Sequence, residues 1–229
     1  MEKLLICAAT KRELIALFPD LSKDSIKLGE VYLKRIKNRD VYVQVCGIGP
    51  INAALFIEKA ILLYKISGVI NIGIAGSFDI KKIPIGSLTI AKEEIWPEYG
   101  LKQRGIVDPK GLKYGLIKKH EKIIYNQISI PFRENFEKMG LSFSNNFYTT
   151  TNLTVAGVTG DKIEAEKLKN RYLAQVENME GFSIAYVCFV HDIPFIEIRS
   201  ISNPVGSRDM DKWDLKKALK KLKKIESIF

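Results

Sequence analysis

Residues Val176–Gly206 read VENMEGFSIAYVCFVHDIPFIEIRSISNPVG, and their pattern decides the fold. The residues after Gly181 are apolar enough to form a helix of the core. Residues 194–202, PFIEIRSIS, then predict a buried strand. One residue does not fit this apolar unit, because the carboxylate of Glu180 stands where the helix opens.

Short β-rich runs alternate with longer helical runs along most of the chain. Strands are expected at residues 3–9, 31–36, 41–49, 68–76, 86–94 and 152–158. Helices are expected at residues 10–18, 51–66 and 161–172, with loops and one or two outer helices over residues 97–150. This alternation is typical of strands that pair in parallel between helical layers. We therefore predict one α/β domain over residues 1–229, a three-layer αβα structure whose central twisted sheet is mixed and largely parallel.

Polar or glycine-rich residues follow several of these strands. They form four stretches, Thr10–Glu13, Gly73–Ser77, Asn178–Gly181 and Ser202–Gly206. In open α/β sheets, ligands bind outside the carboxyl ends of the strands. The four stretches therefore predict a binding site at one edge of the sheet.

The carboxylates in these stretches have structural explanations as well as functional ones. An acidic residue is favoured in the first turn of a helix, which would account for Glu180, with Asn178 as the N-cap. Glu13 stands three residues after Thr10 and fits a capping box. The glycines of GIAGSF, residues 73–78, match neither GxGxxG nor GxxxxGK[ST], so a backbone bend explains them.

Charge and composition narrow the class of protein. The chain of 229 residues carries 36 Lys+Arg against 26 Asp+Glu, a net charge of +10, but its lysines are spread along the whole sequence. They are densest in the tail, where Leu215, Leu219, Leu222 and Ile225 recur at helical spacing. We expect a terminal helix that packs on the core and exposes its lysines, and neither a nucleic acid nor a membrane as partner.

The cysteines indicate the compartment. Cys7, Cys46 and Cys188 all lie in apolar runs, and an odd number of buried thiols is typical of a reducing environment, here the cytoplasm. The cysteines and histidines lack the spacing of metal ligands, so the sequence predicts no metal and no cofactor.

Taken in order, the motifs match a known group of enzymes. ENMEGFSIAYVCFVHDIPFIEIRSISNPVG resembles the nucleoside phosphorylase and nucleosidase superfamily, as do VINIGIAGSF at residues 69–78 and AATKRE at residues 8–13. Within it, NMEG, AKEEIWPEYG and SNPVGSRD most resemble the futalosine hydrolase family. That resemblance implies a small nucleoside as substrate, hydrolysis of its N-glycosidic bond with release of hypoxanthine in a route to menaquinone, and a homodimer or larger homo-oligomer.

The same resemblance implies roles for individual residues. The carboxylate of Glu180 would accept hydrogen bonds from the ribose hydroxyls, and Met179 would pack on the sugar. Glu13 would activate the attacking water. Ala75 and Gly76, at the glycine-rich strand end, would line the place of the substrate.

Two positions bear on the choice of reaction and of base. Phosphorylases of the superfamily carry an arginine where this chain has Asn71, which favours water over phosphate, although Arg12 lies close to the site. Adenine-specific nucleosidases carry an aspartate where this chain has Asn203, whose amide can donate a hydrogen bond but cannot transfer a proton. Asn203, oriented by Ser202, therefore favours hypoxanthine without excluding adenine.

The 5′ side of the substrate and the stacking partner of the base are less defined. Arg208 would bind a 5′ carboxylate, or would form a surface ion pair with Asp209. Ile163 falls where related nucleosidases place a base-stacking phenylalanine. The alternatives are a methylthioadenosine/adenosylhomocysteine or aminofutalosine nucleosidase, a purine nucleoside phosphorylase, and a basic binding protein on an inactivated nucleosidase fold.

Overall fold

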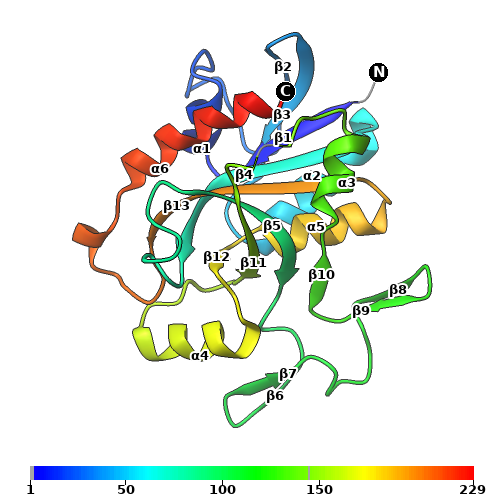
Figure 1. The fold of residues 1–229 in the computed structure, drawn as a ribbon. Coiled ribbons are helices and arrows are strands. Elements are labelled where there is room, and N and C mark those ends of the chain that lie inside the picture. The colour runs from blue at the N-terminus through cyan, green and yellow to red at the C-terminus, as the bar shows by residue number, and fades with distance from the viewer. Residues whose placement is uncertain (1–2, 144) are drawn as a thin grey trace.

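Strands from both ends of the chain meet in the centre of one sheet. The computed structural model describes residues 3–143 and 145–229 (Figure 1), so residues 1–2 and 144 of the predicted domain lie outside the described residues. β4 (Gly68–Ser77) runs between β1 (Leu4–Ala8) and β13 (Phe195–Pro204), parallel to both. Nearly all of their residues are buried and most are apolar, as expected for strands that are covered on both faces.

The nine-stranded sheet is mixed. Its order is β10-β5-β11-β12-β4-β1-β3-β2, and β13 pairs with both β4 and β5. The parallel pairs are β1 with β3, β1 with β4, β4 with β13, β5 with β11, and β11 with β12. The other strands of this sheet are β2 (Val31–Ile36), β3 (Arg39–Val45), β5 (Leu88–Ile95), β10 (Gln127–Ser129), β11 (Tyr148–Thr154) and β12 (Val176–Asn178). This confirms the predicted α/β class with a mixed central sheet.

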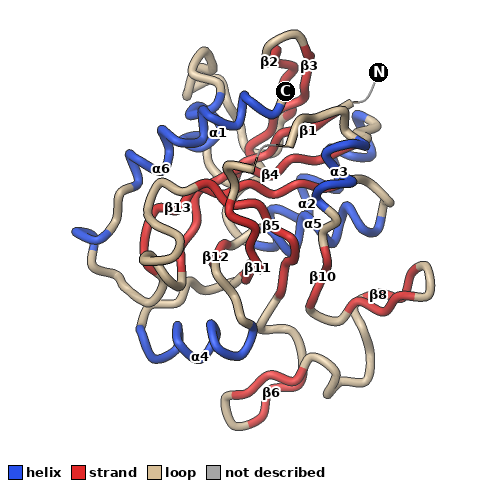
Figure 2. The backbone as a smooth tube through the Cα atoms, in the orientation of Figure 1, coloured by secondary structure: helices blue, strands red, loops and turns tan. Residues whose placement is uncertain are grey.

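Helices cover the sheet on both faces, as Figure 2 shows in blue. α2 (Pro50–Tyr64) and α5 (Gly181–Val190) pack together on one face, and α1 (Lys11–Leu17) and α6 (Leu215–Leu222) pack on the other. The remaining helical segments are α3 (Phe132–Lys138), α4 (Lys162–Tyr172), η1 (Met210–Lys212) and η2 (Lys223–Ile228). In the described part of the chain, no helix has the length and apolar character that a membrane span requires.

The C-terminal helix matches its prediction. Ala218 and Leu222 of α6 and Ile225 of η2 are fully buried. The lysines of α6 are exposed or half-buried. Charge on one side and core contacts on the other are what the helical spacing of the leucines indicates.

The middle of the chain differs from its prediction. It contains the helix α3, but also strands that the sequence did not reveal. They are β6 (Leu101–Gln103), β7 (Ile106–Asp108), β8 (Ile117–Lys119), β9 (Lys122–Ile124) and the edge strand β10. β6–β7 and β8–β9 form two hairpins that project from the sheet, the first at the bottom and the second at the lower right of Figure 1. Strands of three mostly exposed residues carry too short a pattern for periodicity to detect.

Two further assignments need correction. The strand expected at 152–158 is β11, which begins at Tyr148 and ends at Thr154, because its buried threonines pair with β5. Asn178 is the last residue of β12, and Glu180 takes the N-cap position of α5. Asn178 still caps the helix, since its side-chain Oδ1 accepts hydrogen bonds from the Glu180 and Gly181 backbone N–H groups at 3.0 and 2.7 Å.

Candidate active site

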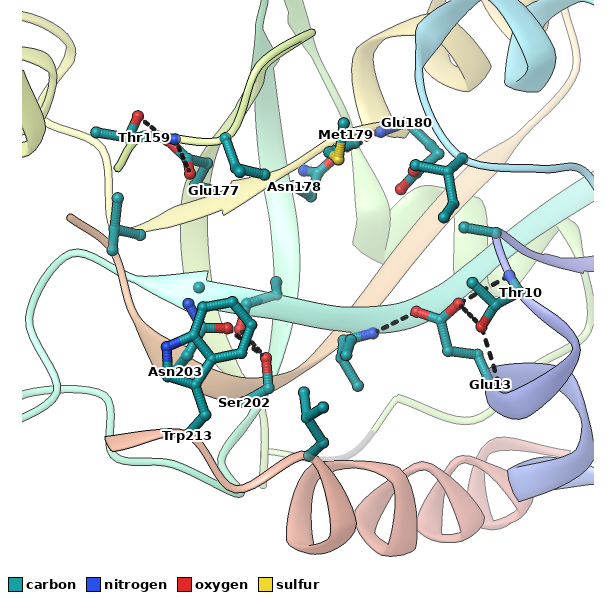
Figure 3. A pocket seen from close by; sticks show the side chains of 18 of the residues that line it. Thr10, Glu13, Thr159, Glu177, Asn178, Met179, Glu180, Ser202, Asn203 and Trp213 are labelled. Carbon is teal, nitrogen blue, oxygen red and sulfur yellow. Dashed lines mark hydrogen bonds between the residues drawn. The ribbon is translucent and has the colours of Figure 1, made fainter. Parts of the chain in front are cut away.

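A cavity of about 390 Å³ opens at the carboxyl ends of β1, β4, β12 and β13 (Figure 3). All four stretches singled out in the sequence contribute to its wall. They supply Thr10 and Glu13, Ile74–Gly76, Asn178–Glu180, and Ser202 and Asn203. The predicted site edge therefore coincides with a cavity that is mostly apolar and also gathers convergent polar groups.

A break in strand pairing creates this cavity. β4 pairs with β1 as far as Asn71, and with β12 from Gly76 onward. Between these two partners, the Ile74 N–H of β4 donates a 2.9 Å hydrogen bond to Glu13 Oε1 instead of to a strand. A side chain thus satisfies a backbone group that a buried sheet cannot leave unpaired.

Glu13 forms the predicted capping box and also lines the cavity. Its Oε2 accepts from the Thr10 backbone N–H at 2.9 Å, and its own N–H donates to Thr10 Oγ1 at 3.3 Å, which completes a capping box. The Oε1 atom reaches β4, and the carboxylate faces the cavity (Figure 3). The cap therefore holds a carboxylate in a fixed position at the cavity wall.

Glu180 is not explained by the helix that it opens. Asn178 supplies the cap, while Glu180 Oε1 accepts from the Gly49 N–H at 3.1 Å and Oε2 from Arg199 Nη2 at 3.3 Å. Burial raises the pKa of Glu180, and the Arg199 charge and the Gly49 hydrogen bond act in the opposite direction. The Glu180 carboxylate lines the cavity, and the start of the helix is capped by Asn178 instead.

Arg199 received no role among the predicted site residues, and it is 1% exposed. Its Nε donates to Glu197 Oε1 at 2.7 Å, and its Nη2 reaches Glu180. Gly73 makes room for it, since a Cβ atom there would lie 2.5 Å from Arg199 Nη1 and 2.7 Å from Glu13 Oε1. A signal was present, because Glu197 and Arg199 alternate with isoleucines in β13 and so share one face of an otherwise apolar strand.

Asn203 and Ser202 form the opposite end of the cavity. Ser202 Oγ donates to Asn203 Oδ1 at 2.6 Å, and Asn203 Nδ2 donates to the Pro204 carbonyl at 3.1 Å. The second Nδ2 hydrogen is left to point elsewhere. At Gly76, a Cβ atom would lie 2.8 Å from Val205 Cγ2 and 3.2 Å from Asn203 Nδ2, so the glycine lets β4 approach the amide closely.

The profile of the phosphorylase superfamily matches residues 8–228. Futalosine hydrolase from Streptomyces coelicolor is 30% identical over 180 residues, 76% of this chain and 71% of the relative. A 5′-methylthioadenosine/S-adenosylhomocysteine nucleosidase from Buchnera aphidicola is 29% identical over 175 residues, 76% of this chain and 72% of the relative. Futalosine hydrolase from Helicobacter pylori, a mutant structure, has a TM-score of 0.76 at 22% identity and covers 99% of this chain and 98% of its own. The chain belongs to the phosphorylase superfamily, within its group of purine nucleosidases.

Of the two residues predicted to bind the base and the 5′ side of the substrate, only one lies at the nucleosidase cavity. Ile163, the second residue of α4, is 72% exposed and is not among the residues that line the cavity, because this helix face turns to the surface. Arg208 does line the cavity, with its guanidinium 5.3 Å from the centre of the Trp213 ring. Asp209 pairs instead with Lys212 at 2.8 Å. The structure thus brings Arg208, but not Ile163, to the other site residues.

Trp213 and α6 complete the nucleosidase cavity, and neither was predicted there. Trp213 is the aromatic residue of the wall in the described chain, and its Nε1 donates to the Ser207 carbonyl at 3.1 Å. Leu215 and Leu219 of α6 add apolar wall. Trp213 lies in a loop ten residues after Asn203, and nothing in the local sequence indicates that its side chain contributes to the cavity wall.

Glu177 anchors the nucleosidase loop on the other side of the cavity. Thr159 donates to its carboxylate from the backbone N–H at 3.1 Å and from Oγ1 at 2.5 Å. Burial raises the pKa of Glu177, and the two Thr159 hydrogen bonds oppose that shift. This contact ties residues 158–159 to β12 and fixes the rim of the site.

Proposed function

We propose that this protein is a futalosine hydrolase, which cleaves the N-glycosidic bond of futalosine with water and releases hypoxanthine for a menaquinone pathway. The observation that carries the proposal is the pair of buried carboxylates, Glu13 and Glu180, each 4% exposed and both on one cavity wall opposite Asn203. Two fixed carboxylates beside one cavity suit a reaction that builds positive charge on a sugar.

In this proposal the ribose lies against Met179 and Glu180. The Glu180 carboxylate accepts hydrogen bonds from the ribose hydroxyls and favours the oxocarbenium-like sugar of the transition state. Each charge-assisted hydrogen bond contributes about 1.5–3 kcal/mol. Glu13 removes a proton from the attacking water, a contribution of about 10²–10⁴-fold to the rate. Arg199 keeps Glu180 in place from behind.

Asn203 supports a 6-oxopurine as the base. Because Ser202 fixes the amide oxygen, Asn203 presents Nδ2 as a donor, and a donor suits a leaving base whose charge spreads onto O6. Ala75 and Gly76 form the adjacent wall. Trp213 offers the aromatic face that Ile163 does not, and Arg208 beside it would bind the carboxylate of the 5′ substituent.

Hydrolysis rather than phosphorolysis is supported by the placement of charge. Asn71 is fully buried in the sheet, where its Nδ2 lies 3.4 Å from Glu197 Oε1. The cationic side chains of the described cavity wall are Arg12 and Arg208.

The substrate is a small nucleoside in this proposal, and neither nucleic acid nor membrane takes part.

We also propose a homodimer, in the cytoplasm. The exposed side of α2 carries large apolar residues, Ile51 at 82% exposure, Leu55 at 59% and Leu62 at 60%. Ile48, just before this helix, is 56% exposed and also lines the cavity. A second copy on this face would bury apolar surface next to the substrate.

A substrate panel tests the proposal. Futalosine, aminofutalosine, methylthioadenosine and inosine are each incubated with and without phosphate, and the free base and sugar are separated by chromatography. We expect hypoxanthine from futalosine without phosphate. Release of adenine from methylthioadenosine or aminofutalosine would show that the protein is the alternative, adenine-releasing nucleosidase and would refute futalosine as the substrate. Strict dependence on phosphate would make the protein a phosphorylase.

A further inference from the structure

A second pair of carboxyl groups lies behind the cavity. Glu94 of β5 and Glu197 of β13 are both fully buried, and neither lines the cavity. Both point at the first residue of α5, where a Cβ atom on Gly181 would lie 2.3 Å from Glu94 Oε1 and 2.5 Å from Glu197 Oε2. The glycine therefore leaves a small space into which both oxygens project.

The hydrogen bonds of the two groups are unequal. Glu197 Oε1 accepts from Arg199 Nε at 2.7 Å, a charge-assisted bond that favours the ionised carboxylate. Glu94 accepts from Thr154 Oγ1 at 2.5 Å and from Asn178 Nδ2 at 2.8 Å, which are both neutral groups. Glu197 Oε2 receives no donor from the described residues, although it is buried.

A proton on Glu94 resolves this arrangement. Two carboxylates that share a buried site cannot both be ionised at low cost. Burial first, and then the charge of Glu197, raise the pKa of Glu94 well above the ordinary range of glutamate. The charged groups around the pair are Glu197 and Arg199 of β13, Glu180 before α5, and Glu13 of α1. Only Arg199 among these is a cation, and it lies against Glu197.

We propose that Glu94 is a neutral acid at pH 7 whose Oε1–H donates to Glu197 Oε2, and that it thereby positions Arg199 and Glu180 for catalysis. The inference rests on the proposed function. Glu94 supports Glu180 along two routes. One runs through Glu197 and Arg199 to the Glu180 carboxylate, and the other through Asn178, whose Oδ1 holds the Glu180 N–H. Glu94 and Glu197 are positioning residues that do not touch the substrate.

The substitution Glu94→Gln distinguishes a protonated carboxyl group from an amide at this position. In a protonated carboxyl, Glu94 Oε1 can donate to Glu197 and still accept from Asn178. Glu94→Gln keeps the shape and the neutral charge, but an amide offers either NH₂ or C=O at that place and serves one partner only. We expect kcat/KM to fall about 3- to 10-fold, which corresponds to one hydrogen bond. Glu93→Gln, a half-buried neighbour in β5 on the other face, is the matched control.

Infrared spectroscopy tests the proton without any substrate. We expect the unmodified protein at pH 7 to show the C=O stretch of a protonated carboxyl group. Glu94→Gln should lose this band, and Glu93→Gln should retain it. Absence of the band from the unmodified protein, or its persistence in a folded Glu94→Gln variant, would overturn the proposal. This result is independent of which nucleoside the enzyme cleaves.

The pH profile then tests positioning, with the nucleoside that is cleaved fastest in the panel. In the unmodified enzyme, kcat/KM should decline at high pH as Glu94 loses its proton and repels Glu197. Glu94→Gln stays neutral at every pH and should lack this alkaline decline. An identical decline in both proteins would show that Glu94 has no positioning role, even if its proton is present.

Discussion

Replacement of Arg199 by methionine removes the cation that holds the site together. The guanidinium is 1% exposed and lies 2.7 Å from Glu197 and 3.3 Å from Glu180, so both carboxylates would stay buried without their partner. Methionine keeps the length of the apolar stem but removes the charge together with its hydrogen-bond donors. Breaking a buried ion pair in this way costs about 3–5 kcal/mol. That loss is a large part of the roughly 5–15 kcal/mol that stabilises an ordinary domain.

The free energy of unfolding is measured by urea titration at pH 7, from the midpoint and the slope of the transition. Lys169→Met is the control, because Lys169 and Asp79 are 3.7 Å apart and each is 29% exposed. A pair this exposed contributes less than about 1 kcal/mol. Arg199→Lys keeps the charge and should lose less stability than Arg199→Met.

The pH dependence of the same variant has a defined sign. Without Arg199, the pKa of Glu180 rises further in the folded state, which then binds a proton that the unfolded state does not. The stability of Arg199→Met relative to the unmodified protein should therefore recover as the pH falls toward the ordinary range of glutamate. A loss of less than about 1 kcal/mol at pH 7, or a difference that stays constant on acidification, would refute the buried ion-pair network.

Four further predictions concern activity. Glu180→Gln should lower kcat/KM about 10- to 150-fold, the equivalent of one charge-assisted hydrogen bond, with an unchanged circular dichroism spectrum. Glu13→Gln should lower kcat about 10²–10⁴-fold, and near-normal turnover would remove Glu13 as the base. Because burial raises the pKa of Glu180, kcat/KM should fall on the acid side at a pH above the ordinary glutamate range, and a fall confined to that range would contradict the assignment. In Gly76→Ala, a Cβ atom 2.8 Å from Val205 and 3.2 Å from Asn203 Nδ2 should displace the amide, so kcat/KM should drop more than the unfolding midpoint does.

Much of the site could be read from the sequence. Three of the four stretches follow β1, β4 and β13, which run parallel, so their carboxyl ends lie on the same side of the sheet. The fourth stretch, Asn178–Gly181, follows β12, which runs antiparallel to β4 and reaches the cavity where the two strands pair at Gly76. The capping box of Thr10 and Glu13 was readable for a similar reason, because its partners are three residues apart. Local spacing and strand direction are properties of the sequence, and they indicated the class of fold and the edge of the sheet at which the cavity lies. The resemblance to the nucleosidases, and not spacing, singled out Glu13 and Glu180.

Tertiary structure alone decided what those carboxylates contact. Asn178 and Glu94 are 84 residues apart, and Asn71 and Glu197 are 126 apart, so no local pattern relates them. Trp213 reaches the cavity and Ile163 does not, because the direction of a loop or a helix face depends on what it packs against. The proton assigned to Glu94 has the same origin. A carboxyl group keeps a proton when the fold removes water from it and sets a second carboxylate beside it, and both conditions arise only when distant strands are brought into register.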